Sequence, residues 1–172
     1  MDSLIEKLQL LVIDFDGVLT DNKVYIGSDN IESVKCTRAD GLAIDALKIL
    51  NINVLILSSE KNCVVLNRAQ KLNVEVLYGI KNKAKALNKY FLNKKINPAN
   101  VAYIGNDIND IDAMLLCGYK LCPLDSHAKI KKIANVLKCK GGDGVLRYFL
   151  EELCLVDLYS LLYKKNNKRI KN

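Results

Sequence analysis

The stretch LLVIDFDGVLTD, which spans Leu10 to Asp21, joins an apolar run to two acidic residues and a glycine. The apolar run has the length and composition of a buried strand, and Asp14 and Asp16 lie where that strand would end. Ligands of parallel α/β sheets bind at the carboxyl ends of strands, and alternation places the two side chains on the same side. Because neighbouring carboxylates repel unless a cation or proton joins them, the stretch favours a divalent metal site or an acid–base pair. A turn cap would explain one aspartate but not the whole stretch.

The rest of the chain alternates short apolar runs with amphipathic stretches, a pattern typical of βα units. It predicts an α/β fold, a Rossmann-like three-layer sandwich around a mostly parallel sheet. The expected strands are 10–14, 53–58, 74–77, 101–105, 119–121 and, more weakly, 135–137; the expected helices are 41–50, 62–72, 82–93, 109–117, 128–134 and 144–163. Residues 23–37 interrupt the alternation, and their two apolar runs around the polar segment 27–30 predict a β-hairpin after the first strand.

The composition indicates one domain that binds neither nucleic acid nor a membrane. Of 172 residues, 50% are hydrophobic, and the formal charge is +7. Five of the 26 Lys and Arg residues lie after position 163, which leaves 21 basic against 19 acidic residues in the body. We therefore expect a domain at 1–163 and a basic tail at 164–172 that aids solubility. A nucleic-acid-binding protein is the alternative, and a salt-sensitive gel shift would test it.

The N-terminal and cysteine patterns favour a cytoplasmic location. The N-terminal stretch carries acidic residues where a secretory signal would carry basic ones, and the apolar runs are too short to span a membrane. The six cysteines are scattered without a CxxC pair, and the single histidine is His127. A zinc site therefore lacks correctly spaced ligands, and reduced thiols in a reducing compartment are expected.

Three further strand ends carry polar side chains. Ser58 ends the second expected strand, with Ser59 and Glu60 just after it. Lys83 begins the helix after the third strand, and Asn106, Asp107 and Asp110 follow the fourth. Each cluster has a simpler explanation, because Ser58 could cap a helix, Asn109 or Asp110 could cap the helix after the fourth strand, and Lys83 lies among other surface lysines. In chain order, however, the four strand ends supply carboxylate, hydroxyl, ammonium and carboxylate. That combination suits metal-assisted phosphoryl transfer through an aspartyl-phosphate.

The four clusters resemble motifs I to IV of the haloacid dehalogenase superfamily of phosphatases, which DFDGVLTD, LSSEKN, Lys83 and GNDIND match in order and spacing. The lack of a cap insertion, the hairpin, RADG at 38–41 and KGGDGVLR at 140–147 resemble the capless 3-deoxy-D-manno-octulosonate 8-phosphate phosphatase group. That group also includes nonulosonate (acylneuraminate and KDN) 9-phosphate phosphatases and phosphatase-like domains attached to acylneuraminate cytidylyltransferases. The resemblance implies a haloacid dehalogenase-like fold without a cap domain.

The resemblance also implies catalytic roles. Asp14 would be the nucleophile, and Asp16 would be the general acid and later the base that activates water. Ser58 and Lys83 would hold the phosphoryl oxygens, with the lysine offsetting charge that builds in the transition state.

The implied cofactor is Mg²⁺, held by Asp14, by the backbone carbonyl of Asp16 and by Asn106. The family usually has aspartate at the position of Asn106, and Asp107 would compensate for the missing charge. The amide leaves a second interpretation open. In it, the chain is a weak or inactive phosphatase domain that supports oligomerisation in a cytidylyltransferase pathway.

The residues that follow Ser58 bear on the substrate. Octulosonate phosphatases of this family typically have Gly-Arg after the two serines, whereas this chain has Glu60 and Lys61, followed by Arg68 and Lys71 one helical turn apart. This spacing is similar to that of the nonulosonate branch, so a sialic-acid-like 9-phosphate is favoured over the octulosonate 8-phosphate. A solvated surface pair is the alternative for Arg68 and Lys71. The expected substrate-binding residues are Arg38, Ser59, Glu60, Arg68 and Lys71.

The same resemblance implies a homotetramer. Members of the family pack their hairpins together, so that a neighbouring subunit shields a site that has no cap. The hairpin at 23–37 carries Val24, Ile26, Ile31 and Val34, which would suit such packing.

Overall fold

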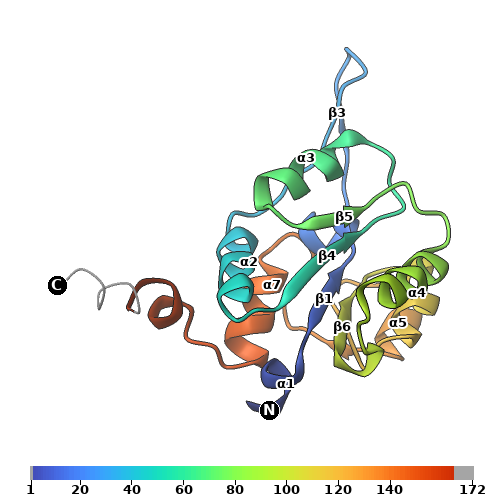
Figure 1. Cartoon of the computed structure of the whole chain (residues 1–172). Coiled ribbons are helices and arrows are strands. Elements are labelled where there is room, and N and C mark those ends of the chain that lie inside the picture. Colours follow the sequence, from blue (N-terminus) through green and yellow to red (C-terminus); the bar gives the residue numbers. More distant parts are fainter. Residues whose placement is uncertain (1, 165–172) are drawn as a thin grey trace.

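Six parallel strands form the central sheet in the computed structural model, which describes residues 2–164 (Figure 1). The order across the sheet is β5 (Glu75–Leu77), β4 (Asn53–Leu57), β1 (Leu10–Ile13), β6 (Val101–Ile104), β7 (Tyr119–Cys122) and β8 (Asn135–Val136). β1 is entirely apolar and buried, as expected of a strand covered on both faces. Ile13 pairs with Ile56 on one side and Ile104 on the other, so three strands end at the same edge. The α/β class and the expected strands are confirmed.

Helices cover both faces of the sheet because alternate strand residues point to opposite sides. Leu11 and Ile13 of β1 belong to one buried cluster, and Leu10 and Val12 belong to another. The first layer contains α2 (Ala39–Ile49), α3 (Cys63–Leu72) and α7 (Val145–Tyr148); the second contains α4 (Lys83–Lys94), α5 (Ile111–Leu115) and α6 (Ala128–Lys131). Figure 1 shows α2 and α7 on one side of the sheet and α4 and α5 on the other. The expected three-layer arrangement is confirmed.

The predicted hairpin is present and projects from the body beyond α3 (Figure 1). Its strands, β2 (Tyr25–Ile26) and β3 (Glu32–Ser33), pair antiparallel, and Asn30 in the turn adopts a left-handed φ of 60°. At the hairpin base, Thr20 and Cys36 form an isolated antiparallel bridge. Val24, Tyr25, Ile26 and Ile31 are exposed, with Ile26 at 73%, whereas Val34 packs against the first core cluster.

The two ends of the domain differ from the sequence prediction. A helix, α1 (Asp2–Lys7), precedes β1 where none was expected, and Leu4 and Ile5 pack against the first core cluster. Residues 165–172 of the expected basic tail lie outside the described residues. No helix between residues 2 and 164 combines the length and apolarity needed to cross a bilayer.

The expected helix at 144–163 is not continuous. α7 passes into a π-helical turn, η4 (Phe149–Leu153), and Leu155 then adopts a left-handed φ of 55° before η5 (Ser160–Lys164). The amide N–H of Val156 donates to the carbonyl of Leu150, which closes the end of the first helical segment. Apolar spacing predicted this segment as helical but contained no signal for the break.

Asp40 connects α2 to α7. Its Oδ1 accepts a hydrogen bond from the amide N–H of Leu146 at 2.9 Å, whereas its Oδ2 is buried without a hydrogen-bond partner. Burial raises the pKa of Asp40 to about 6 from 3.8, although the backbone donors of Leu146 and Arg147 and the guanidinium of Arg68 oppose the rise. The ionised carboxylate is therefore costly at neutral pH.

We expect Asp40→Asn to remove a pH-dependent loss of stability. The pKa of Asp40 is higher in the folded state than in the unfolded state, so ionisation of Asp40 lowers the free energy of unfolding of wild type. The loss begins at about pH 4, is complete above about pH 6, and amounts to roughly 3 kcal/mol. Asparagine keeps an acceptor oxygen for Leu146. The free energies of unfolding of wild type and Asp40→Asn can be measured in urea at pH 5 and pH 8. Between these two pH values, the free energy of unfolding of the variant should rise by about 1 to 2 kcal/mol relative to that of wild type. A difference that does not change with pH would contradict this assignment.

Candidate active site

Asp14 lies at the carboxyl end of β1, where hydrogen bonds fix its position. Its amide N–H donates to the carbonyl of Ile104 at 3.0 Å, and its Oδ1 accepts from the amide N–H of Phe15 at 2.7 Å. The chain then makes a π-helical turn, η1 (Phe15–Leu19), in which Gly17 has a left-handed φ of 77°. A Cβ at Gly17 would overlap the amide of Asn106. The glycine therefore allows Asn106 to pack over the turn beside Asp14.

Lys83 is the buried cation of the site. It begins α4, is 2% exposed, and its Nζ lies 2.9 Å from Asp14 Oδ1 and 2.7 Å from Asp110 Oδ1. Burial disfavours the charged ammonium, but Asp14 and Asp110 raise the pKa of Lys83 above its ordinary value. The interpretation of Lys83 as a solvated surface lysine is therefore wrong.

The carboxylates around Lys83 outnumber it. Burial and the neighbouring Asp110 raise the pKa of Asp14 to about 8, while Lys83 opposes the rise. Burial, and then the charge of Glu60, raises the pKa of Asp16, although the hydroxyl of Thr20 donates to Asp16 Oδ1 at 3.4 Å. A further cation at this edge of the sheet would stabilise the ionised carboxylates.

Asp110 is fully buried and accepts four hydrogen bonds. Oδ1 accepts from Lys83 Nζ and from the hydroxyl of Tyr103 at 2.8 Å, while Oδ2 accepts from the amide N–H groups of Asn106 at 3.0 Å and Asp107 at 3.3 Å. The sequence placed Asp110 in the fourth cluster with helix capping as its only suggested role, and it did not single out Tyr103. The available signals were the spacing of Asp110 from Asn106 and a phenol inside an otherwise apolar strand.

A small cleft of about 200 Å³ opens at this edge, lined by Asp14, Asp16, Asn22, Asn106, Asp107, Ile108 and Asn109. All four expected metal ligands line it, whereas Asn22, Ile108 and Asn109 were not predicted. The side chain of Asp107 accepts from the amide N–H of Ile108 and caps η3 (Ile108–Asp110), a role that the simpler explanation had given to Asn109 or Asp110.

The donor set of the cleft fits Mg²⁺, which prefers oxygen ligands. Asp14 supplies a carboxylate, Asn106 an amide oxygen and Asp107 a second carboxylate. In the described part of the chain, no three His, Cys, Asp or Glu side chains gather as metal ligands. This agrees with asparagine standing where the family usually has a carboxylate.

The polar residues after β4 lie beside the cleft. Ser58 is 1% exposed, and its Oγ accepts from the amide N–H of Glu60 at 3.0 Å, which leaves its own hydroxyl proton as a donor. Ser59 Oγ accepts from the side-chain amide of Asn109 at 3.3 Å, joining this loop to η3. The Glu60 carboxylate accepts from the amide N–H groups of Lys61 and Asn62. The charge of Glu60 contributes to the raised pKa of Asp16, which lines the cleft.

Three expected substrate-binding residues lie elsewhere. Arg38, Arg68 and Lys71 line a larger pocket of about 970 Å³ between α2, α3 and α7, together with Arg147. This pocket shares no lining residue with the cleft. Arg68 is held there by a 2.9 Å hydrogen bond from Nη2 to the carbonyl of Thr37. The structure therefore gathers these cations in one pocket, and none of them lines the cleft at Asp14.

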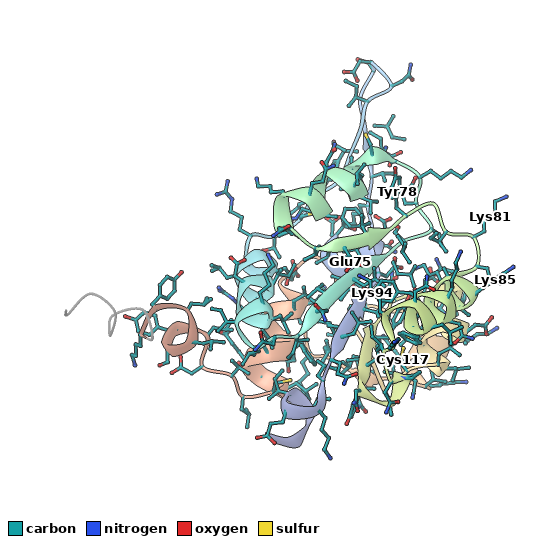
Figure 2. All side chains as sticks on the ribbon, in the orientation of Figure 1. Glu75, Tyr78, Lys81, Lys85, Lys94 and Cys117 are labelled. Atoms are coloured by element: carbon teal, nitrogen blue, oxygen red, sulfur yellow. The ribbon has the colours of Figure 1, made fainter. Side chains whose placement is uncertain are left out.

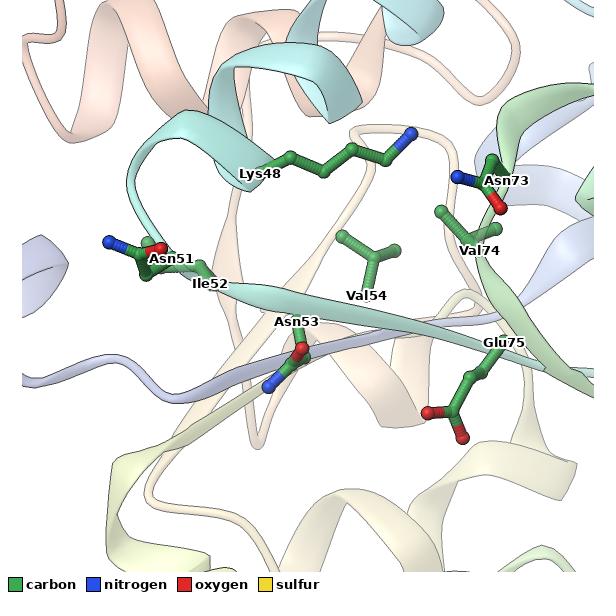
Figure 3. Close-up of a pocket in the computed structure, with 8 residues that line it drawn as sticks. All are labelled: Lys48, Asn51, Ile52, Asn53, Val54, Asn73, Val74 and Glu75. Atoms are coloured by element: carbon green, nitrogen blue, oxygen red, sulfur yellow. The ribbon is translucent and has the colours of Figure 1, made fainter.

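A third pocket, of about 360 Å³, lies at the amino ends of β4 and β5, the sheet edge opposite the cleft. Figure 3 shows Lys48 extending from α2 toward Asn73, and its Nζ donates to the carbonyl of Leu72 at 2.7 Å. None of the predicted catalytic, metal-binding or substrate-binding residues lines this pocket.

Comparison with known proteins identifies the family. The model of the haloacid dehalogenase-like hydrolases matches residues 44–149. The 3-deoxy-D-manno-octulosonate 8-phosphate phosphatase of Salmonella typhi is 33% identical over 152 residues, which is 87% of this chain and 81% of that protein.

Solved structures share the fold. A protein from Streptomyces avermitilis described as a HAD family hydrolase is 40% identical, with a TM-score of 0.82 over 86% of this chain and 91% of that chain. The octulosonate 8-phosphate phosphatase of Moraxella catarrhalis, solved with magnesium ion, phosphate ion and KDO, is 23% identical, with a TM-score of 0.82 over 98% and 95% of the two chains. The chain belongs to the haloacid dehalogenase-like hydrolases and is related to the octulosonate 8-phosphate phosphatases within them.

Proposed function

We propose that the protein is a magnesium-dependent phosphatase that hydrolyses the phosphate monoester of a 3-deoxy-2-ulosonic sugar acid. The observation that carries this proposal is the state of Asp14. Its Oδ1 is held by Phe15 and Lys83, whereas its Oδ2 has no hydrogen-bond partner among residues 2–164 and belongs to a residue that lines the cleft. One carboxylate oxygen is thus anchored and the other is left for attack on phosphorus.

The proposed reaction has two steps. Asp14 Oδ2 attacks phosphorus, the bond from phosphorus to the sugar oxygen breaks, and Asp16 gives its proton to that oxygen. Asp16 then takes a proton from water, the water oxygen attacks the aspartyl-phosphate, and inorganic phosphate leaves as Asp14 is restored. Lys83 and the hydroxyl of Ser58 hold the phosphoryl oxygens while charge builds on them.

Magnesium is the cofactor we assign to the cleft. The carboxylate of Asp14, the backbone carbonyl of Asp16 and the amide oxygen of Asn106 would hold the ion, with Asp107 beside them. When bound, the ion supplies positive charge that stabilises the carboxylates and the transferring phosphoryl group. Because Asn106 brings no charge, a weak or inactive domain that supports assembly is a second candidate, and rapid turnover of an aryl phosphate with Mg²⁺ would exclude it.

For the substrate, we propose 3-deoxy-D-manno-octulosonate 8-phosphate, the compound named in the Salmonella typhi relative. The sequence favoured a nonulosonate 9-phosphate, and none of the relatives described above supports that preference. The nine-carbon acid is kept as a second candidate because the charge of Glu60, one of the residues on which the preference rested, raises the pKa of Asp16. Arg38, Ser59, Arg68 and Lys71 are the other residues that we assign to the sugar acid.

We also propose a cytoplasmic homotetramer. Val24, Tyr25, Ile26 and Ile31 expose apolar side chains on a two-stranded hairpin, and such a surface suits packing against further copies of the chain. The six cysteines carry free thiols, which suits a reducing compartment.

Asp14→Asn is expected to abolish turnover, because the amide cannot attack phosphorus. The loss should be roughly a thousandfold or more in kcat for an aryl phosphate with Mg²⁺. Far-ultraviolet circular dichroism of the variant should match that of wild type. Activity close to that of wild type would rule out covalent catalysis by this residue.

Asn106→Asp is expected to tighten magnesium binding by adding a carboxylate to the ligand set. The Mg²⁺ concentration for half-maximal activity should fall about three- to tenfold. Asn109→Asp is the matched control, because Asn109 lines the same cleft but is not an assigned ligand. An equal fall in both variants would show a general charge effect instead of ligation at Asn106.

The two sugar acids can be compared directly. We expect kcat/KM for the octulosonate 8-phosphate to exceed that for a nonulosonate 9-phosphate at least tenfold, about 1.4 kcal/mol of transition-state binding, at one fixed Mg²⁺ concentration. A tenfold preference in the opposite direction would make the nine-carbon acid the substrate.

A further inference from the structure

Tyr103 places a hydroxyl group inside an apolar layer. It lies on β6, is fully buried, and belongs to the cluster that contains Leu10 and Val12 of β1 and Leu55 and Leu57 of β4. Packing alone would be satisfied by phenylalanine at this position. The hydroxyl instead donates to Asp110 Oδ1 at 2.8 Å.

The acceptor of that bond also holds the buried lysine. Asp110 Oδ1 accepts from Lys83 Nζ at 2.7 Å, and Lys83 Nζ lies 2.9 Å from Asp14 Oδ1. The chain of contacts therefore runs from Tyr103 through Asp110 and Lys83 to Asp14. Every group in it is buried.

We infer that Tyr103 is a positioning residue for the phosphatase reaction, one that acts on Asp14 and the phosphoryl group through Asp110 and Lys83. The inference rests on the proposed function. Tyr103 does not line the cleft, so we class it as a positioning residue and not as a catalytic one. Its hydroxyl sets where Asp110 Oδ1 lies, and that oxygen sets where the Lys83 ammonium lies.

Removing the Tyr103 hydroxyl would affect Asp110 Oδ1 but not the hydrogen bonds of Asp110 Oδ2. Asp110 Oδ2 is held independently by the amide N–H groups of Asn106 and Asp107, so that loop keeps its anchor when the phenol is removed. Oδ1 then keeps Lys83 as its single donor among the described residues, and the carboxylate and ammonium can shift together. Burial, together with Asp110, raises the pKa of Tyr103 well above its ordinary value, so the phenol stays a donor at working pH.

A displaced ammonium affects the transition state more than substrate binding, because charge on the phosphoryl oxygens is largest during transfer. The inference therefore predicts a change in kcat with little change in KM. It also predicts weaker inhibition by vanadate, which resembles the transition state, with unchanged inhibition by inorganic phosphate.

The test compares Tyr103→Phe with Tyr90→Phe. Tyr90 lies on α4, the helix that carries Lys83, and its hydroxyl also donates to a carboxylate, Glu75 Oε2 at 3.1 Å. That bond lies on the outside of the molecule, where Figure 2 labels Glu75 with its ion-pair partner Lys94. Each variant thus removes one hydroxyl donor to a carboxylate, but only Tyr103 belongs to the chain of contacts that reaches Asp14.

With an aryl phosphate and saturating Mg²⁺, we expect kcat of Tyr103→Phe to fall about tenfold, or 1.4 kcal/mol, with KM changed less than twofold. Inhibition by vanadate should weaken in proportion to kcat, and Tyr90→Phe should behave as wild type. A purely structural role would lower thermal stability and leave kcat of the folded enzyme and the vanadate-to-phosphate inhibition ratio unchanged. That result would overturn the inference while the proposed function stands.

An inactive wild-type protein would instead overturn the proposed function. Crystal structures of wild type and Tyr103→Phe would then decide the positioning itself. A Lys83 Nζ displaced from Asp14 in the variant would support it, and an unmoved ammonium would refute it.

Discussion

The site depends on burying one ammonium between two carboxylates. Lys83, Asp14 and Asp110 have side chains that are 1%, 6% and 0% exposed, so each charge would be costly without the other two. The contact requires β1 beside β6, a helix that begins at Lys83, and a loop after β6 that turns Asp110 back toward the sheet. The register that places Ile13 opposite Ile104 is therefore needed both for the packing of the core and for the contact between Lys83 and the two carboxylates.

Around this contact the structure separates two environments. The cleft at Asp14 is small and lined by carboxylates and amides, which suits a metal ion and a phosphoryl group. The neighbouring pocket is larger and lined by Arg38, Arg68, Lys71 and Arg147. Cys36, on the wall of that pocket, bridges to Thr20, whose hydroxyl contacts Asp16. In the proposed function, chemistry belongs to the first environment and recognition of an acidic sugar draws on the second.

Asn106 affects the balance between negative and positive charge at the site. Its amide packs over Gly17 and its backbone is held by Asp110, so its place in the cleft does not depend on charge. The carboxylates around Lys83 exceed the cations, and Asn106 limits that excess by one charge. The same substitution that reduces attraction for a divalent cation thus also reduces repulsion among the buried groups.

The sequence by itself determined the α/β class, the core strands, the hairpin, and the grouping of Asp14, Asp16, Asn106 and Asp107 at one edge. These follow from local patterns, because an apolar run of strand length and the residues after it are neighbours in the chain. Only the tertiary structure decided that Lys83 is buried, that Tyr103 bonds Asp110, that Arg68 lines a different pocket from Asp14, and that the last helix breaks at Leu155. Each of these depends on partners brought close by the fold, as Lys83 and Asp110 are across 27 positions of sequence. Periodicity assigns a residue to a face, but the group it meets there is set by the neighbouring strands and helices.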